Sequence, residues 1–423
     1  MKTIHLEPLH ETIVEFVSEN GLNVRILPKK GFVKTSVSLQ IGFGSIDVFV
    51  RNSNGDFKLP DGIAHFLEHM IFENTDKDIS KSFTEIGASV NAYTTYNRTV
   101  YYFSTASPLE KGLNLLLETV FHPEFDSEQI EKERKIISSE IQMYEDDLEQ
   151  SLYYDTMKLM YKHHPISSDI AGTKESIAQI NETVLKTAFD VFYHPENALL
   201  VISGDVDTDF VKDLVNAKMS GINFGVHHQT SLLIEDEHQS IVSPRLSVKK
   251  DMMNSFVMIG IRLDLPFYTP SQGAIEEMKL LLLMDNFFSK SSEFYKTLQK
   301  QKAINNNFDF SVTVEPSFAH ILFFAETKTP EKTASAIKSM ILKIKTLKLD
   351  VERFVIQKRK IIGQFVQIFN STSSASALVS EYALKNTRID ELIASIESFD
   401  IEEMTPLVEL IQEDKIVEVI YHS

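Results

Sequence analysis

The chain has 423 residues, of which 43% are hydrophobic, enough for two or more packed domains and inconsistent with a fibrous or disordered protein. Its 60 acidic and 42 basic residues give a net charge of -18, which would repel a phosphate backbone, so no nucleic-acid partner is expected. The absence of cysteine excludes thiolate metal sites and leaves His and carboxylates as metal ligands. Because the sequence has no signal-peptide pattern and no run of 18 apolar residues, we expect no membrane insertion and a cytoplasmic location.

The first half of the chain predicts a module that mixes strands and helices. Two β-rich runs within 21–50 are separated by a Pro-Lys-Lys-Gly turn, which predicts a hairpin. Over 111–161, apolar residues then recur at helical spacing, which predicts a long helical region. The stretch 184–204 then passes from a helix through YHPEN to the strand ALLVISGD.

A second cycle of similar pattern begins near residue 243. The run SPRLSVKKDMMNSFVMIGIRLDL repeats the pattern of the opening hairpin, and VEVIYHS at the end of the chain predicts a closing strand. Between the halves, 219–242 lacks periodicity and predicts a linker that contains His227, His228 and His238. We therefore predict an α+β fold of two similar modules, each an antiparallel sheet flanked by helices, with domains at 1–218 and 243–423.

The stretch PDGIAHFLEHMIFENT at 60–75 predicts an amphipathic helix with metal-binding chemistry. His65, Glu68 and His69 fall on the face opposite the apolar stripe. Two imidazoles one turn apart can bind one cation, and Glu68 can reach a water in the cation's open position. This order is H-x-x-E-H, the reverse of H-E-x-x-H. The alternative is a solvated outer face made of ordinary polar residues. The apolar stripe consists of Ile63, Phe66, Leu67, Met70 and Ile71.

A catalytic zinc of this kind requires a third ligand, for which we predict Glu140. The helical neighbours of Glu140, one turn away on either side, are all apolar or aromatic, which predicts a buried carboxylate. A buried acid needs a partner, either a metal or a Lys or Arg side chain. Glu133, seven residues earlier, is the rival ligand, and it could instead hydrogen-bond a ligating histidine. The neighbours of Glu140 are Ile136, Ile137, Met143 and Tyr144.

The remaining loop histidines give weaker signals. His122, His163, His164 and His194 stand in turn-like, proline-containing contexts, which predicts surface or turn positions. The segment GASVNAYTTYNRTVYYFST at 87–105 predicts two short strands around a turn. If this hairpin lies at a sheet edge beside the metal helix, it could accept a peptide as an added strand. The alternative is a hairpin inside the sheet.

These motifs, in this order, resemble the pitrilysin family, which includes insulysin and the mitochondrial processing peptidases. HFLEHMIF at 65–72 is similar to the family's zinc helix, and GASVNAYTTYNRTVYYF at 87–103 to its substrate strand. ERKIISSE at 133–140 is similar to the stretch that carries the third ligand. HPISSDIAGTKESI at 164–177 and FYHPENALLVISGD at 192–205 extend the resemblance over nearly the whole chain.

The resemblance implies an enzyme built from paired half-modules around a chamber. It implies a zinc endopeptidase that cleaves short or unfolded peptides, with one zinc per chain; the alternative is a non-catalytic binding or assembly subunit. It assigns the residues as follows: zinc ligands His65, His69 and Glu140; general base Glu68; Glu133 beside a ligating histidine; and Asn91, Ala92 and Tyr93 along the bound peptide.

One departure from the family pattern concerns the second module. Active single-chain relatives carry an Arg and, seven residues on, a Tyr in the later domain, where this sequence has Gln299 and Asn306. The chain length matches the family's two-module subunits, which pair to build a four-module chamber. The resemblance therefore implies a heterodimer with a homologous two-module partner that lacks the zinc motif and supplies Arg and Tyr. A homodimer is possible as well.

Overall fold

The computed structural model describes residues 1–53, 55–72, 79–222, 224–225, 229–233, 237, 240–264 and 268–423. These residues form two compact units, each assembled from separate stretches of the chain. The first unit consists of Met1–Met143, Ser168–Ile234 and Val366–Leu384. The second consists of Tyr144–Ser167, Glu235–Phe365 and Lys385–Ser423.

A seven-stranded sheet forms the first unit. Its strand order, β1-β2-β3-β9-β4-β8-β7, places β7 at an edge. Strands β3 and β9 run parallel, and the other neighbouring strands are antiparallel. All residues of β4 and β9, at the centre of the sheet, are buried. The strands are β1 (Lys2–Leu6), β2 (Glu11–Val17), β3 (Asn23–Pro28), β4 (Thr35–Ile41), β7 (Ala88–Thr94), β8 (Thr99–Thr105) and β9 (Ala198–Gly204).

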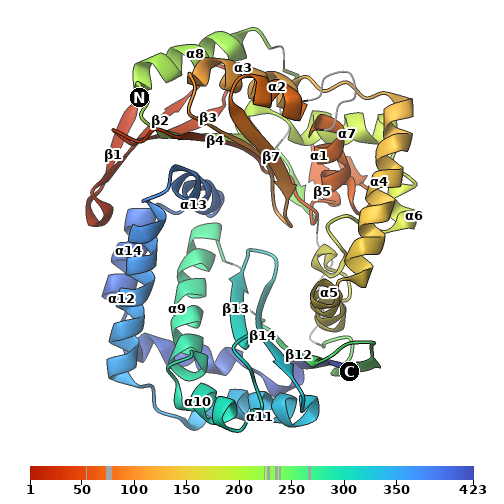
Figure 1. Ribbon diagram of the computed structural model, residues 1–423, viewed down its shortest axis with the longest axis vertical. Coiled ribbons are helices and arrows are strands. Elements are labelled where there is room, and N and C mark those ends of the chain that lie inside the picture. The colour runs from red at the N-terminus through yellow and green to blue at the C-terminus, as the bar shows by residue number, and fades with distance from the viewer. Residues whose placement is uncertain are drawn as a thin grey trace. The chain divides into compact units, whose positions relative to one another are not determined.

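Helices cover both faces of this sheet (Figure 1). Helix α3 packs on β4 and β8, whereas α13 packs on β4 and β9. Helix α1 lies against β7 and α7. The helices are α1 (Ile63–Phe72), α2 (Ile79–Glu85), α3 (Leu109–Phe121), α4 (Ser127–Asp146), α6 (Lys174–Ile177), α7 (Glu182–Phe192), α8 (Thr208–Ser220) and α13 (Thr372–Leu384). A small separate sheet contains β5 (Phe49–Asn52), β6 (Gly55–Lys58) and β10 (Ser231–Leu232).

The second unit contains a five-stranded sheet of order β11-β15-β12-β14-β13. Helix α5 packs on β12 and β15, and α11 packs on β12 and β14. The strands are β11 (Arg245–Lys249), β12 (Ser255–Arg262), β13 (Asp309–Val314), β14 (Ala319–Thr327) and β15 (Ile416–His422). The helices are α5 (Leu148–Met160), α9 (Pro270–Phe288), α10 (Glu293–Lys300), α11 (Pro330–Lys343), α12 (Val351–Ile368) and α14 (Ile389–Ser398).

The two sheets repeat one topology. The order β3-β9-β4-β8-β7 corresponds to β11-β15-β12-β14-β13, and in each case the first of these pairings is parallel and the rest are antiparallel. The predicted α+β fold of two similar modules is therefore confirmed, as is the closing strand at the C-terminus.

Both predicted opening hairpins are wrong. Strand β9 lies between β3 and β4, and β15 lies between β11 and β12, so the strands on either side of each turn do not pair with each other. Strand β9 bonds to neighbours on both sides, and its seven residues are all buried. A turn signal reports only local chain reversal, whereas the inserted strand comes from far along the chain.

The compact units do not follow the order of the predicted domains. Helix α5, which comes from within the predicted domain 1–218, belongs to the second unit, and α13, from within 243–423, belongs to the first. A small residue permits the close packing of α5: a Cβ added at Gly260 on β12 would lie 2.9 Å from atoms of Met160 and Thr156 on α5. The boundaries 1–218 and 243–423 remain a prediction about modules that are continuous in sequence.

Part of the predicted linker 219–242 lies outside the described residues, including His227, His228 and His238. Of the described part, β10 forms a short strand that pairs with β5. Within the ranges that the structure describes, none of the helices has the length and apolar character that a bilayer span requires.

Candidate metal centre

Helix α1, which carries the two histidines of the site, is anchored in the first unit by one completely buried face. The five residues of the predicted apolar stripe are at most 1% exposed, so the stripe is confirmed. The helix begins just after Gly62, whose positive φ of +87° and close approach to the carbonyl oxygen of Ala171 leave no room for a side chain. Residues 73–75 of the predicted helix lie outside the described residues. The remaining face of α1 carries the polar residues.

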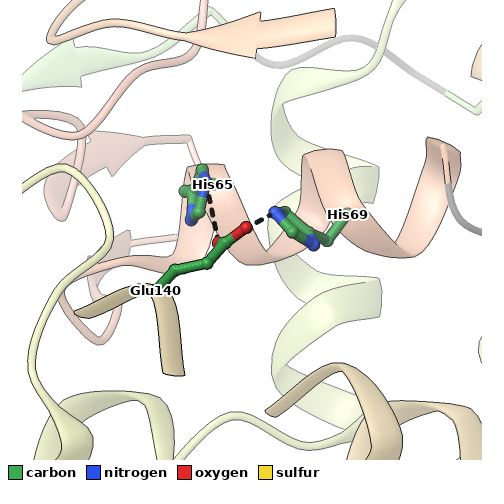
Figure 2. Close-up of side chains that lie close together, drawn as sticks. All are labelled: His65, His69 and Glu140. Carbon is green, nitrogen blue, oxygen red and sulfur yellow. Dashed lines mark ion pairs between the residues drawn. The ribbon is translucent and has the colours of Figure 1, made fainter. Parts of the chain in front are cut away.

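His65, His69 and Glu140 converge at this polar face (Figure 2). Nε2 of His69 lies 3.4 Å from Oε2 of Glu140, and Nε2 of His65 lies 4.0 Å from the same oxygen. The two imidazoles come from successive turns of α1, and the carboxylate comes from α4. The three ligand atoms lie within 4.8 Å of one another, in the only such group among the described residues.

The chemistry of this group fits a zinc ion. Zinc takes imidazole nitrogen and carboxylate oxygen at about 2.0 to 2.2 Å in a tetrahedron, whose ligand atoms are then roughly 3.3 Å apart. The observed separations of 3.4 and 4.0 Å lie near this value. Oε2 of Glu140 is also buried, and its contacts are with the two imidazoles. A carboxylate oxygen in this condition is a ready ligand for a cation.

Charge in the site is unevenly shared between the two imidazoles. Burial alone would lower the pKa of His69, but hydrogen bonds to Glu133 and Glu140 and the nearby carboxylate charges outweigh it and raise the pKa to about 10. Burial and the neighbouring His69 lower the pKa of His65 to about 4. The hydrogen bond to His69 lowers the pKa of Glu140. Without a metal, a proton on His69 therefore supplies the positive charge that the carboxylates require.

Glu133 and Glu140 contact opposite sides of the His69 ring. Oε2 of Glu133 lies 3.3 Å from Nδ1, whereas Glu140 faces Nε2. Glu133 is completely buried, but the Glu140 side chain is 29% exposed. The predicted burial of Glu140 is therefore wrong, because two of its apolar neighbours, Ile136 and Met143, are themselves exposed. The geometry favours Glu140 as the ligand and Glu133 as the residue that orients the ring.

Glu68 lies beside the metal ligands with little contact with solvent. It is 8% exposed, and burial raises the pKa of its carboxyl, although a hydrogen bond from Thr94 partly offsets this shift. Oγ1 of Thr94 donates to Oε2 of Glu68 over 2.7 Å. The alternative of a solvated polar face is therefore wrong. Sequence reasoning also missed Thr94, although it directly follows Asn91, Ala92 and Tyr93 in the same predicted strand.

Asn91, Ala92 and Tyr93 lie on β7, which α1 contacts. Strand β7 pairs with β8 along one side, and no described strand pairs with its other side. The alternative of a hairpin enclosed within the sheet is therefore wrong, and β7 has an edge without a described strand partner beside the metal group. Asn91 and Tyr93 are exposed, whereas Ala92 is half-buried.

His164 lies in a turn, as predicted, but not at the surface. His164 is fully buried in the second unit, where its Nδ1 accepts a hydrogen bond from the backbone of Ile166. Its ring packs against Tyr161 and Phe318. The contexts of His122 and His194 agree with the prediction, since each lies directly after a helix or at the start of a short turn.

Comparisons with known proteins point to one family. Residues 31–174 match the family model described as Insulinase (Peptidase family M16), and residues 179–361 match the model described as Peptidase M16 inactive domain. The chain is 33% identical over 411 residues to the uncharacterized zinc protease YmfH of Bacillus subtilis, an alignment that covers 97% of this chain and 96% of YmfH.

Solved structures share the whole fold. The M16-like peptidase from Alicyclobacillus acidocaldarius superposes with a TM-score of 0.94 at 27% identity, over 97% of this chain and 98% of that one. Pitrilysin superposes with a TM-score of 0.75 at 14% identity, over 97% of this chain but only 45% of the pitrilysin chain. The likeness to pitrilysin concerns the fold alone.

We expect Glu140→Gln to weaken zinc binding more than Glu133→Gln does, because a ligand bonds the metal whereas a residue behind the ligand only orients it. Loss of an orienting residue typically costs about 10- to 100-fold in metal affinity. Competition with a chelator would measure both affinities, with Glu145→Gln, an exposed change on the same helix, as the control. A greater loss of zinc affinity in Glu133→Gln than in Glu140→Gln would identify Glu133 as the third ligand.

Proposed function

The chain belongs to peptidase family M16, and on that basis we propose that it is a zinc-dependent endopeptidase that cleaves short or unfolded peptides in an enclosed chamber. The observation that carries the proposal is the convergence of His65, His69 and Glu140 beside a buried Glu68. This arrangement is that of the H-x-x-E-H metallopeptidases.

In this proposal each residue of the site has a separate task. His65, His69 and Glu140 hold the zinc, and Glu133 fixes the orientation of the His69 ring through Nδ1. When bound, zinc would polarise the scissile carbonyl and make a water more acidic. Glu68 takes a proton from the attacking water and later passes it to the leaving amine. Burial favours this task, since it brings the pKa of the carboxyl closer to neutral pH.

The edge of β7 supports a peptide substrate. An extended peptide can add to an open edge through main-chain hydrogen bonds, which recognise backbone rather than sequence. We propose that Asn91, Ala92 and Tyr93 provide this edge. Helix α1 contacts the same strand, so a peptide bound there would pass close to Glu68.

The second unit supports a stoichiometry of one zinc per chain. Oε2 of Glu277 on α9 accepts a hydrogen bond from the backbone of Val314, the last residue of β13, much as Glu68 is tied to the last residue of β7. The positions that correspond to His65 and His69 are Ala274 and Met278. Nζ of Lys385, 2.9 Å from Glu277, supplies the positive charge here.

We further propose that the active enzyme is a heterodimer. Gln299 and Asn306 hydrogen-bond each other at 3.1 Å, Nε2 of Gln299 donating to Oδ1 of Asn306, and both are exposed. Neutral amides lack the charge and the rigid fork of a guanidinium, so a self-pair would stabilise the transition state poorly. A homologous two-module subunit without the zinc motif would supply Arg and Tyr. Homodimers and a cytoplasmic location remain predictions.

We expect Glu68→Gln to keep zinc and the fold but to reduce peptide hydrolysis at least about a hundredfold, the usual contribution of a general base. The measurements are zinc content by mass spectrometry of the metal and kcat on an unstructured peptide, with Glu85→Gln as a control outside the site. A variant that lost zinc and still hydrolysed peptide would show that Glu68 is a ligand. Wild-type protein that binds no zinc would favour a non-catalytic subunit.

We expect a co-expressed two-module partner that carries Arg and Tyr to raise the activity per zinc about a hundred- to a thousandfold, the usual effect of one transition-state donor. The comparison is between this chain purified alone and the purified complex. Substitution of the partner's Arg should return the complex to the activity of the lone chain. Full activity of the lone chain, without gain from any such partner, would contradict the proposal.

A further inference from the structure

The buried side of Glu68 is held by a single hydroxyl from the neighbouring sheet. Oγ1 of Thr94 donates to Oε2 of Glu68 over 2.7 Å, a short distance typical of a hydrogen bond to a charged acceptor. A hydroxyl has one proton, so this donation commits Thr94 to the glutamate. No hydrogen bond from another described residue to Glu68 competes with it in the structure. Oε1 is therefore left for the reacting water.

The position of the Thr94 hydroxyl is fixed from behind. A β-branched side chain on a strand has few allowed χ1 rotamers, and Thr94 pairs in register with Thr99 of β8. Oγ1 of Thr99 lies 3.4 Å from Oγ1 of Thr94 and donates to the carbonyl oxygen of Phe43 over 2.9 Å. Thr99 is fully buried, so these hydroxyls form part of the rigid sheet.

Two phenols complete the polar surroundings in the core. The hydroxyls of Tyr101 and Tyr193 lie 2.8 Å apart, and both side chains are buried. Thr94 contacts Glu68 directly and Thr99 lies next to Thr94, while burial and, secondarily, the charge of Glu68 raise the pKa of both phenols. Such an environment can fix the direction of a carboxylate without neutralising it.

We propose that Thr94 is a positioning residue for Glu68, which holds Oε2 so that Oε1 faces the water. The inference rests on the proposed role of Glu68 as the base. It adds a link to substrate binding, because Thr94 directly follows Asn91, Ala92 and Tyr93 on β7. A peptide that pairs with this edge would also stiffen the strand that orients the base.

The kinetic test compares Thr94→Val, which keeps the shape but removes the hydroxyl, with Thr94→Ser, which keeps the hydroxyl. We expect Thr94→Val to lower kcat at least about tenfold with little change in KM, since a poorly aligned base affects the chemical step. Thr94→Ser should recover most of the loss, and zinc affinity should remain that of the wild type in both. Equal losses in the two variants, or a change confined to KM, would overturn the proposal.

A second measurement does not depend on activity or zinc. A double-mutant cycle of Thr94→Val and Glu68→Leu in the metal-free chain, followed by denaturant unfolding, reports the coupling between the two side chains, because Leu has no acceptor for the Thr94 hydroxyl. We expect a coupling of about tenfold or more in the unfolding equilibrium constant, the usual size for a hydrogen bond to a charged group. In the control cycle, Thr84→Val replaces Thr94→Val. The Thr84 hydroxyl donates to the carbonyl oxygen of Ser80 on α2, so this variant should show no coupling to Glu68.

The two measurements separate the possible failures. If the chain is not a peptidase, the coupling will still be present while no turnover is found, and the proposed function fails alone. If turnover depends on Glu68 but the cycle shows no coupling and Thr94→Val is fully active, the role of Thr94 is wrong and the proposed function stands.

Discussion

The site depends on one imidazole held between two carboxylates. His69 contacts Glu133 through Nδ1 and Glu140 through Nε2, and Glu68 adds a third carboxylate close by. Such a group is stable in a largely buried position only if a cation is present, either a proton on His69 or a metal ion. A metal would displace that proton, so metal binding and proton release are linked. The same excess of carboxylates that raises the pKa of His69 makes the group attractive to zinc.

The second unit balances the charge of its buried carboxylates with a lysine instead of a metal or a protonated histidine. It has the same sheet topology, and a buried glutamate on α9 is tied to the end of its edge strand. Here Lys385 contacts both Glu277 and Glu315 and supplies a permanent charge from within the chain. One module is therefore complete without a metal, whereas the other contains a site that a metal can complete. This difference explains in physical terms how two modules of one fold can divide structural and chemical tasks.

Much of the site could be predicted because its signals are local. The spacing of His65, Glu68 and His69 predicted that they share one face of a helix, and β-strand propensity predicted the two strands of the β7–β8 hairpin. The failures involve contacts between distant segments. Turn signals could not show that β9 and β15 insert into the predicted hairpins. Apolar neighbours wrongly predicted a buried Glu140, because a helix surface can expose residues such as Met143. Thr94 and Lys385 act through contacts that their sequence neighbours do not reveal.

The most direct test of this account is the coordination of zinc itself. X-ray absorption spectroscopy on the purified chain with one equivalent of zinc reports the type and number of ligand atoms. The account predicts one tightly bound zinc per chain with two imidazole nitrogens and oxygen ligands, and the loss of one imidazole in His65→Ala. A zinc environment without imidazole, or a spectrum unchanged by His65→Ala, would contradict it.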